Sequence, residues 1–336
     1  MLTVLPVSGL PEVSAGDDLA ALVAARADLR DRDVVVVAQK VVSKAEGALL
    51  WARPGEDRAA ARRRLARAEA ARVVVDAPGA LVVETRHGLV CANAGIDASN
   101  VPGGAFLRLP ADPDRSARAL RAGLRAVAGV EVAVIVADTF GRPWRTGVTD
   151  VAIGVAGLHP LRDERGGVDR HGNRLEATCV AVADELAAAA DLVRRKADGV
   201  PVVVVRGYVY EADERAGAGL LRRRPEDDLF RRGRGALADT LGTASPVAAG
   251  VDPADLERAA GAARRVGGAG VRVASAGGVV AVAGPDLDAG AGAGAAIAAL
   301  VDLGYLAARR PPRPGEEATV VVVGGRPAEP SDDRGR

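Results

Sequence analysis

The sequence predicts an α/β fold built on a sheet that is covered on both faces. Segments with helical spacing alternate with short apolar segments through about the first 245 residues. The apolar segments are rich in valine and carry almost no polar residues, which is typical of strands buried on both sides. At 336 residues, the chain is long enough to bury a substantial core.

The predicted elements follow one another in a regular order. Gly16 to Asp18 precede the first helical segment and are typical of a helix start. Helices are predicted over residues 19–29, 58–71, 116–128 and 175–196. Buried strands are predicted over residues 33–38, 131–137 and 202–205, and a further pair over 72–76 and 81–85, around a Pro-Gly turn.

One long stretch interrupts this pattern. Residues 140–173 are polar and rich in glycine, with little periodicity. Loops of this length in compact domains are usually functional or disordered. We therefore expect a mixed α/β arrangement rather than a simple doubly wound sheet.

The C-terminal part predicts a small α/β appendage. Helices are expected over residues 252–265 and 291–308, and strands over 271–274, 279–283 and 318–323. The expected domains are residues 1–245, the appendage 246–327, whose role the sequence does not reveal, and a disordered tail 328–336.

Composition excludes several classes of protein. The 45 basic and 44 acidic residues nearly cancel, which argues against binding nucleic acid through net charge. Cys91 and Cys179 are too few for a disulfide framework and have no zinc-site spacing. No basic N-terminal region or long uncharged apolar segment suggests a signal peptide or membrane span. We expect a cytoplasmic protein without nucleic-acid or membrane partners.

The scarcity of lysine is informative. Only Lys40, Lys44 and Lys196 are lysines, so 42 of the 45 basic residues are arginine. An exposed surface tolerates either cation, whereas a site that needs a compact ammonium does not. Chance survival is the alternative, but two lysines four residues apart favour a function.

Asp138 and Thr139 form the clearest candidate site. They follow the apolar segment 131–137, and ligands of α/β proteins gather beyond the carboxyl ends of strands. A carboxylate and a hydroxyl suit Mg²⁺ or Mn²⁺. An Asp that caps the next turn is an equally weighted alternative.

Two other segments offer partners for such a metal. Asp97 could supply a second carboxylate and Asn100 an amide, although both residue types are also common in turns. Gln39 and the lysines at 40 and 44 follow a predicted strand, where a lysine can reach the phosphates of a nucleotide. Cationic clamps could come from Arg142, Arg145 and Arg206, but each is equally well a surface arginine.

The run from Arg194 to Lys196 has a simpler interpretation, because cations in the last turn of a helix complement its dipole. The G-x-x-x-x-G-K-[ST] motif of P-loop enzymes is missing from the sequence. The residues alone therefore predict a soluble, metal-dependent α/β enzyme that handles phosphate.

Nine segments, in order through most of residues 4–240, carry a family resemblance. They are residues 9–12 (GLPE), 16–18 (GDD), 41–47 (VVSKAEG), 94–101 (AGIDASNV), 138–145 (DTFGRPWR), 149–158 (TDVAIGVAGL), 183–187 (ADELA), 201–207 (PVVVVRG) and 226–230 (EDDLF). Together they resemble the coenzyme F420-0:L-glutamate ligase family, which implies that family's mixed α/β fold and a homodimer.

The resemblance also implies a set of site residues. Contacts to GTP would come from Leu10, Pro11, Glu12, Val13, Gln39, Lys44, Asn100 and the turn around Lys196. Asp97 and Asp138 would hold one divalent metal and Thr139 a second. Two departures concern nucleotide contacts: Gln39 stands where some relatives carry Ser, and Arg195 where Gly is common.

The implied activity is the GTP-dependent addition of L-glutamate to coenzyme F420-0 through an acyl phosphate, with Lys44 as a catalytic residue that offsets charge. Mg²⁺ or Mn²⁺ would be required, and a monovalent cation such as K⁺ is a further candidate cofactor. The number of γ-linked glutamates stays open.

Bacterial relatives often carry a flavin-binding second half, but residues 246–336 are too short for it, so no flavin is expected. A metal-dependent phosphohydrolase or other nucleotide-using enzyme and a non-catalytic nucleotide-binding protein are the alternatives.

Overall fold

The computed structural model describes residues 1–77, 79–101, 103–194, 199–224, 227–228, 253–267, 272–276, 279–283, 306–310 and 319–323. The chain divides into two compact units, Met1–Arg231 and Arg232–Arg336. The predicted domain boundary at residue 245 and the predicted disordered tail both lie outside the described residues, so they remain predictions.

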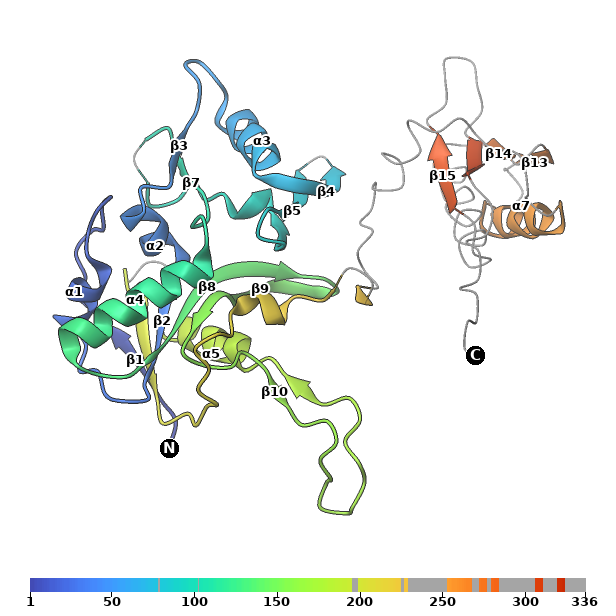
Figure 1. Ribbon diagram of the computed structural model, residues 1–336. Coiled ribbons are helices and arrows are strands. Elements are labelled where there is room, and N and C mark those ends of the chain that lie inside the picture. The colour runs from blue at the N-terminus through green and yellow to red at the C-terminus, as the bar shows by residue number, and fades with distance from the viewer. Residues whose placement is uncertain are drawn as a thin grey trace, which may run out of the picture. The chain divides into compact units, whose positions relative to one another are not determined.

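A five-stranded mixed sheet forms the centre of the first unit (Figure 1). Its strand order is β1 (Thr3–Val7), β12 (Val202–Arg206), β2 (Val34–Ala38), β8 (Ala133–Arg142) and β9 (Arg145–Ala156). The β2–β8 pair is parallel, whereas the other three pairs in this order are antiparallel. The predicted α/β class is confirmed, and the mixed pairing agrees with the expectation that the sheet is not simply doubly wound.

Helices cover both faces of this sheet, as predicted. Val35 and Val37 of β2 pack in one core with α1 (Leu19–Ala24) and α4 (Pro113–Ala128). The alternate residues, Val34 and Val36, pack in a second core with α5 (Val182–Asp191). Successive side chains of a strand point to opposite faces, so an unbroken run of valines fills both cores. Burial of one such side chain contributes roughly 1.5–3 kcal/mol.

Local signals set the ends of the helices. The carboxylate of Asp18 accepts hydrogen bonds from the backbone N–H groups of Ala20 and Ala21, so it is the N-cap of α1, in the region that the sequence predicted. The helix α4 begins at Pro113 after the N-cap Asp112. A left-handed residue, Gly129, then ends it.

A smaller lobe is inserted between β2 and α4. It contains α2 (Gln39–Ala45), α3 (Arg58–Ala68) and the short 3₁₀ helix η1 (Asn93–Gly95). Its strands are β3 (Leu49–Trp51), β4 (Ala70–Ala77), β5 (Ala80–Thr85), β6 (Val90–Ala92) and β7 (Ala105–Leu107). Buried Phe106 and Ile96 belong to a separate apolar core between α3 and β5.

The helices predicted over 19–29 and 58–71 end earlier, at Ala24 and Ala68, and two other predictions in this unit are wrong over longer segments. Residues 140–156 are no loop, because β8 and β9 run on as a long hairpin around Pro143 and Trp144. In the described part of the helix expected over 175–196, only α5 is helical. The backbone of Leu175 to Val180 pairs instead with residues 162–167, including β10 (Arg162–Asp163) against β11 (Cys179–Val180). Pairing across this hairpin overrides the helical preference of the segment.

The second unit contains α7 (Pro253–Gly267) and a four-stranded antiparallel sheet. The strand order is β13 (Arg272–Ala276), β14 (Val279–Ala283), β16 (Thr319–Val323) and β15 (Leu306–Arg310). The predicted α/β content is therefore confirmed. The predicted helix 291–308 is wrong at its end, since residues 306–308 pair in β15, and residues 291–305 lie outside the described part.

Across the described residues, no helix has the length and apolar character needed to cross a membrane.

Candidate active site

The site lies at one end of the central sheet. The parallel pairing of β2 and β8 stops at Ala38 and Ala137, after which α2 begins and β8 continues alongside β9. Asp138 and Thr139 therefore follow the last residue of β8 that pairs with β2. The alternative in which Asp138 caps a turn is wrong, because its strand continues to Arg142.

A pocket of about 830 Å³ opens at this end of the sheet. The site residues that the family resemblance implies all line it, as far as the structure describes them: Leu10, Pro11, Glu12, Val13, Gln39, Lys44, Asp97, Asn100, Asp138 and Thr139. Lys196 lies outside the described residues. Segments far apart in the sequence thus meet in one cavity, although their individual roles remain predictions.

The loop that carries Asp97 has an unusual backbone. Asn93, Ala94, Gly95 and Asn100 all have positive φ angles, between 51° and 68°. A Cβ atom at Gly95 would meet the side chain of Leu109 at 2.7 Å. Packing and left-handed geometry therefore provide the reason for glycine at 95. Left-handed conformations of other residues are strained and are frequent at functional sites.

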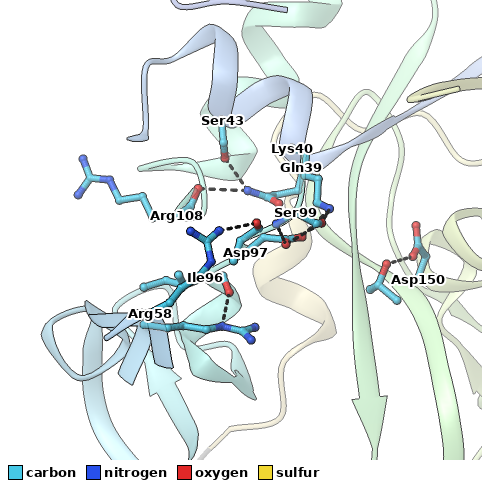
Figure 2. Close-up of polar contacts among 12 residues, drawn as sticks. Gln39, Lys40, Ser43, Arg58, Ile96, Asp97, Ser99, Arg108 and Asp150 are labelled. Carbon is cyan, nitrogen blue, oxygen red and sulfur yellow. Dashed lines mark hydrogen bonds and ion pairs between the residues drawn. The ribbon is translucent and has the colours of Figure 1, made fainter. Parts of the chain in front are cut away.

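Lys40 holds the carboxylate of Asp97 (Figure 2). Its Nζ lies 2.6 Å from Asp97 Oδ2 and 2.6 Å from Ser99 Oγ. The other carboxylate oxygen, Oδ1, accepts hydrogen bonds from the backbone N–H and the hydroxyl of Ser99, both at 2.8 Å. Both carboxylate oxygens of Asp97 are therefore already engaged by the protein, and Oδ2 binds the positively charged ammonium of Lys40.

The two predicted metal-binding carboxylates differ in acidity. Burial is the main cause that raises the pKa of Asp138 to about 6, and the negative charge of Asp97 adds to it. Burial also acts on Asp97, but hydrogen bonds from Lys40 and Ser99 outweigh it and lower that pKa. The pair consequently favours a nearby cation, because each carboxylate disfavours the charge of the other.

A third carboxylate, Asp150, was missed by the sequence analysis. It lies opposite Thr139 in the β8–β9 hairpin, and its Oδ1 accepts the Thr139 hydroxyl at 2.7 Å (Figure 2). Its side chain is fully buried and forms an ion pair with Arg194. Recognition of residues 140–156 as part of a hairpin would have placed Asp150 opposite Thr139, but the sequence of this segment predicted a loop.

This contact changes the interpretation of Arg194. The helix α5 ends at Asp191, so Arg194 is not in its last turn, and the dipole interpretation is wrong for this residue. Its side chain is only 10% exposed and lines the pocket. Among the described residues, its Nη1 atom has no hydrogen-bond partner. Arg194 thereby places a buried positive charge beside Asp150 and the pocket.

The predicted nucleotide-binding residues have different surroundings. Lys44 is only 11% exposed, and its ammonium pairs with Glu12, whose side chain is largely exposed. Gln39 is buried, and its amide group donates to Ser43 Oγ at 2.6 Å and to the Arg108 carbonyl at 3.1 Å. Lys44 thus presents a charge beside the pocket, whereas the amide nitrogen of Gln39 is already engaged by the protein.

The three arginines that the sequence offered as cationic clamps lie in two different places in the structure. Arg206 is no part of the pocket, because it pairs with Asp33 at the opposite end of the central sheet. Arg142 and Arg145 are exposed at the turn of the β8–β9 hairpin.

The carboxylates fit a divalent cation that is shared with another ligand. Within the described part of the chain, no group of three or more His, Cys, Asp and Glu side chains could hold a metal. The donors expected from the sequence are Asp97, Asp138 and the Thr139 hydroxyl, which all line the pocket, and the ammonium of Lys40 already contacts Asp97. Mg²⁺ is typically held by about one or two carboxylates together with phosphate and water.

Comparisons with known proteins agree with the resemblance found in the motifs. Residues 9–207 match the family F420-0:Gamma-glutamyl ligase. A protein of Methanopyrus kandleri named "Coenzyme F420:L-glutamate ligase" is 45% identical over 248 residues, which covers 68% of this chain and 98% of that relative. A relative with the same name from Halobacterium salinarum is 49% identical over 245 residues, covering 67% of this chain and 94% of the relative. The chain therefore belongs to the F420-0:gamma-glutamyl ligase family.

Proposed function

We propose that this protein is a GTP- and divalent-metal-dependent ligase that adds L-glutamate to coenzyme F420-0. The observation that carries this proposal is the shared pocket, where Lys44 and Asn100 lie with Asp97, Asp138 and Thr139. Relatives at 43–49% identity carry the name "Coenzyme F420:L-glutamate ligase", which supports the same reaction here.

The reaction requires activation because a carboxylate is a poor acyl donor. In the proposed first step, the terminal carboxylate of F420-0 attacks the γ-phosphorus of GTP, forming an acyl phosphate and releasing GDP. The amine of L-glutamate then attacks the acyl carbon, which forms the amide, expels phosphate and loses a proton. A bound divalent cation would supply positive charge to the phosphate oxygens.

Residues of this chain would position the groups and offset charge. Lys44 has the compact charge needed beside a transferring phosphoryl group, and it can leave Glu12 because that carboxylate is solvated. The Thr139 hydroxyl donates a hydrogen bond to Asp150, so the lone pairs of the Thr139 oxygen remain available to a cation. Asp97 and Asp138 would hold the metal.

Further features of the activity belong to the same proposal. Additional γ-linked glutamates, a K⁺ requirement and a homodimer are expected from the family resemblance. Each has its own measurement: product mass, dependence on KCl, and mass in solution by light scattering.

A ligase assay tests the proposal. Purified protein is incubated with GTP, Mn²⁺ or Mg²⁺, L-glutamate and F420-0, and the product is identified by its mass. We expect a gain of one or more glutamyl units that requires both GTP and metal. Arg165→Ala is a suitable control, because Arg165 lies on the exposed β10–β11 hairpin and forms an ion pair with its near neighbour Asp163.

The remaining outcomes separate the alternatives. Release of GDP without glutamate incorporation would favour a phosphohydrolase or a different acceptor. Tight GTP binding with no turnover would favour a non-catalytic nucleotide-binding protein. Either result would reject the ligase assignment.

A further inference from the structure

Lys40 occupies the position on Asp97 that a metal ion would need. Lys40 is the second residue of α2, a helix that begins directly after the end of β2. Its Nζ contacts Asp97 Oδ2 and the Ser99 hydroxyl, and only 22% of its side chain is exposed. The resemblance assigned no role to this lysine, although it is one of only three in the chain.

A single ammonium here serves two carboxylates. The positive charge of Lys40 acts on both Asp97 and Asp138, whose negative charges repel each other. Ser99 occupies Asp97 Oδ1, so Lys40 is the group on the oxygen that is left for coordination. A divalent cation and an ammonium repel each other, so close binding of both to this oxygen is disfavoured.

We propose that Lys40 is a resident counter-ion that exchanges with the divalent cation. When the cation binds Asp97 and Asp138, it displaces the ammonium of Lys40. The released ammonium then binds a phosphate group of the nucleotide in the same pocket. Lysine suits this exchange because its charge lies at the end of a flexible four-carbon chain. The identity of the cation and the nucleotide rests on the proposed function.

The exchange couples metal and nucleotide binding. Without nucleotide, the metal has to displace Lys40 from its ion pair, so metal binding alone is weak. With nucleotide, the displaced ammonium gains a phosphate partner, so each ligand strengthens the binding of the other by the same factor. A structural Lys40 would add nothing to the coupling that arises when the cation itself binds the phosphates.

Lys44 provides a matched control within the same helix. It is also a pocket lysine of α2, but its ammonium pairs with Glu12 rather than with Asp97. Loss of Lys44 can weaken nucleotide binding, but it leaves the counter-ion of Asp97 in place.

The experiment titrates Mn²⁺ and follows free Mn²⁺ by electron paramagnetic resonance, with and without GDP. Wild type, Lys40→Met and Lys44→Met are compared after circular dichroism has shown that each is folded. We expect Lys40→Met to bind Mn²⁺ about tenfold more tightly without GDP, and GDP to enhance that binding less than in wild type. Lys44→Met should not bind Mn²⁺ more tightly than wild type. Unchanged or weaker Mn²⁺ binding by Lys40→Met would overturn the proposal.

Chemical labelling of the lysines in the wild-type protein tests the exchange of Lys40 even if a variant does not fold. Acetic anhydride labels accessible lysines, and each of the three can be assigned by peptide mass. We expect Mn²⁺ alone to increase the labelling of Lys40 and subsequent GDP to decrease it. Labelling of Lys40 that does not respond to Mn²⁺ would contradict the exchange.

Neither measurement uses F420-0 or glutamate, so both are independent of the ligase assay. An active ligase whose Lys40 ignores Mn²⁺ would reject only this inference. A protein without ligase activity that still exchanges Lys40 for Mn²⁺ would reject only the proposed reaction.

Discussion

The two ends of the central sheet both carry buried charge, but they use it differently. At the end away from the pocket, Arg206 donates to both oxygens of Asp33, from Nε at 2.9 Å and from Nη2 at 2.8 Å. Asp33 is almost fully buried and also accepts a backbone hydrogen bond from Arg30. This two-point pairing satisfies the carboxylate within the protein.

Charge at the pocket end is less well compensated. Asp97, Asp138 and Asp150 lie near Lys40 and Arg194, and mutual repulsion contributes to the raised pKa of Asp138. The comparison shows how the same residue types serve stability when their bonds are completed internally, and binding when some charge is left for a ligand.

Asp138→Asn should produce the largest change in activity. The amide keeps the shape of the side chain but removes a negative charge that the proposed metal site would use. We expect the ligase rate to fall about 1,000-fold, which corresponds to roughly 4 kcal/mol. The same variant should be at least as stable as wild type in thermal unfolding at pH 7.5, because it removes a buried, repelled charge. Wild-type-like turnover at low metal concentration would rule out this role for Asp138.

Arg206→Met tests the opposite end. It leaves Asp33 buried without its partner, so we expect unfolding in urea to require about 3 kcal/mol less free energy. Turnover per folded molecule should stay near the wild-type value. Arg206→Lys is the matched control and should lose less stability, because it keeps the charge. A large loss of turnover in folded Arg206→Met would contradict the division between the two ends.

Gly95→Ala probes the loop that positions Asp97. The new methyl group would meet Leu109, and the residue has a φ of +68°. We expect a loss of about 2 kcal/mol in the free energy of unfolding and weaker Mn²⁺ binding. Gly166→Ala is a useful comparison, because that glycine has a similar positive φ but open space around it. Equal losses in Mn²⁺ affinity for both variants would show that the effect does not depend on Asp97.

The dependence of metal binding on pH is the prediction with the smallest expected effect. Since the pKa of Asp138 is about 6, protons should compete with Mn²⁺ below that pH, lowering its affinity by up to about tenfold per pH unit. The raised pKa also means that the folded protein binds this proton more tightly than the unfolded chain. Ionisation of Asp138 should therefore reduce stability as the pH rises from about 4 to about 6, and this effect should level off at higher pH. Asp138→Asn should lose this part of the pH dependence of both quantities.

Much of the sheet could be predicted because valine runs such as Val34 to Val37 have no alternative to burial on both faces. Asp138 and Lys44 could be proposed because both follow predicted strands and lysine is rare in this chain, and Asp97 could be proposed as a second carboxylate for the same metal. Their meeting in one pocket supports those choices. Their individual contacts with GTP and metal remain predictions.

The features that were missed depend on long-range pairing. Asp150 becomes meaningful only when β9 is aligned with β8, and the glycine-rich sequence concealed that hairpin. The helix expected over 175–196 failed for a similar reason, since residues 162–167 compete for its first part. Local propensity carries no information about such partners. Likewise, composition could not distinguish Arg206, which stabilises the sheet, from an arginine that faces a ligand.

The most direct test of the account is the position of Mn²⁺ in crystals of the protein, found by anomalous scattering. We expect a peak at about 2.1 Å from carboxylate oxygens of both Asp97 and Asp138, with the ammonium of Lys40 moved away from Asp97. A peak elsewhere, or no peak while Lys40 still contacts Asp97 at saturating Mn²⁺, would contradict the claim that the pocket end of the sheet leaves charge for a metal.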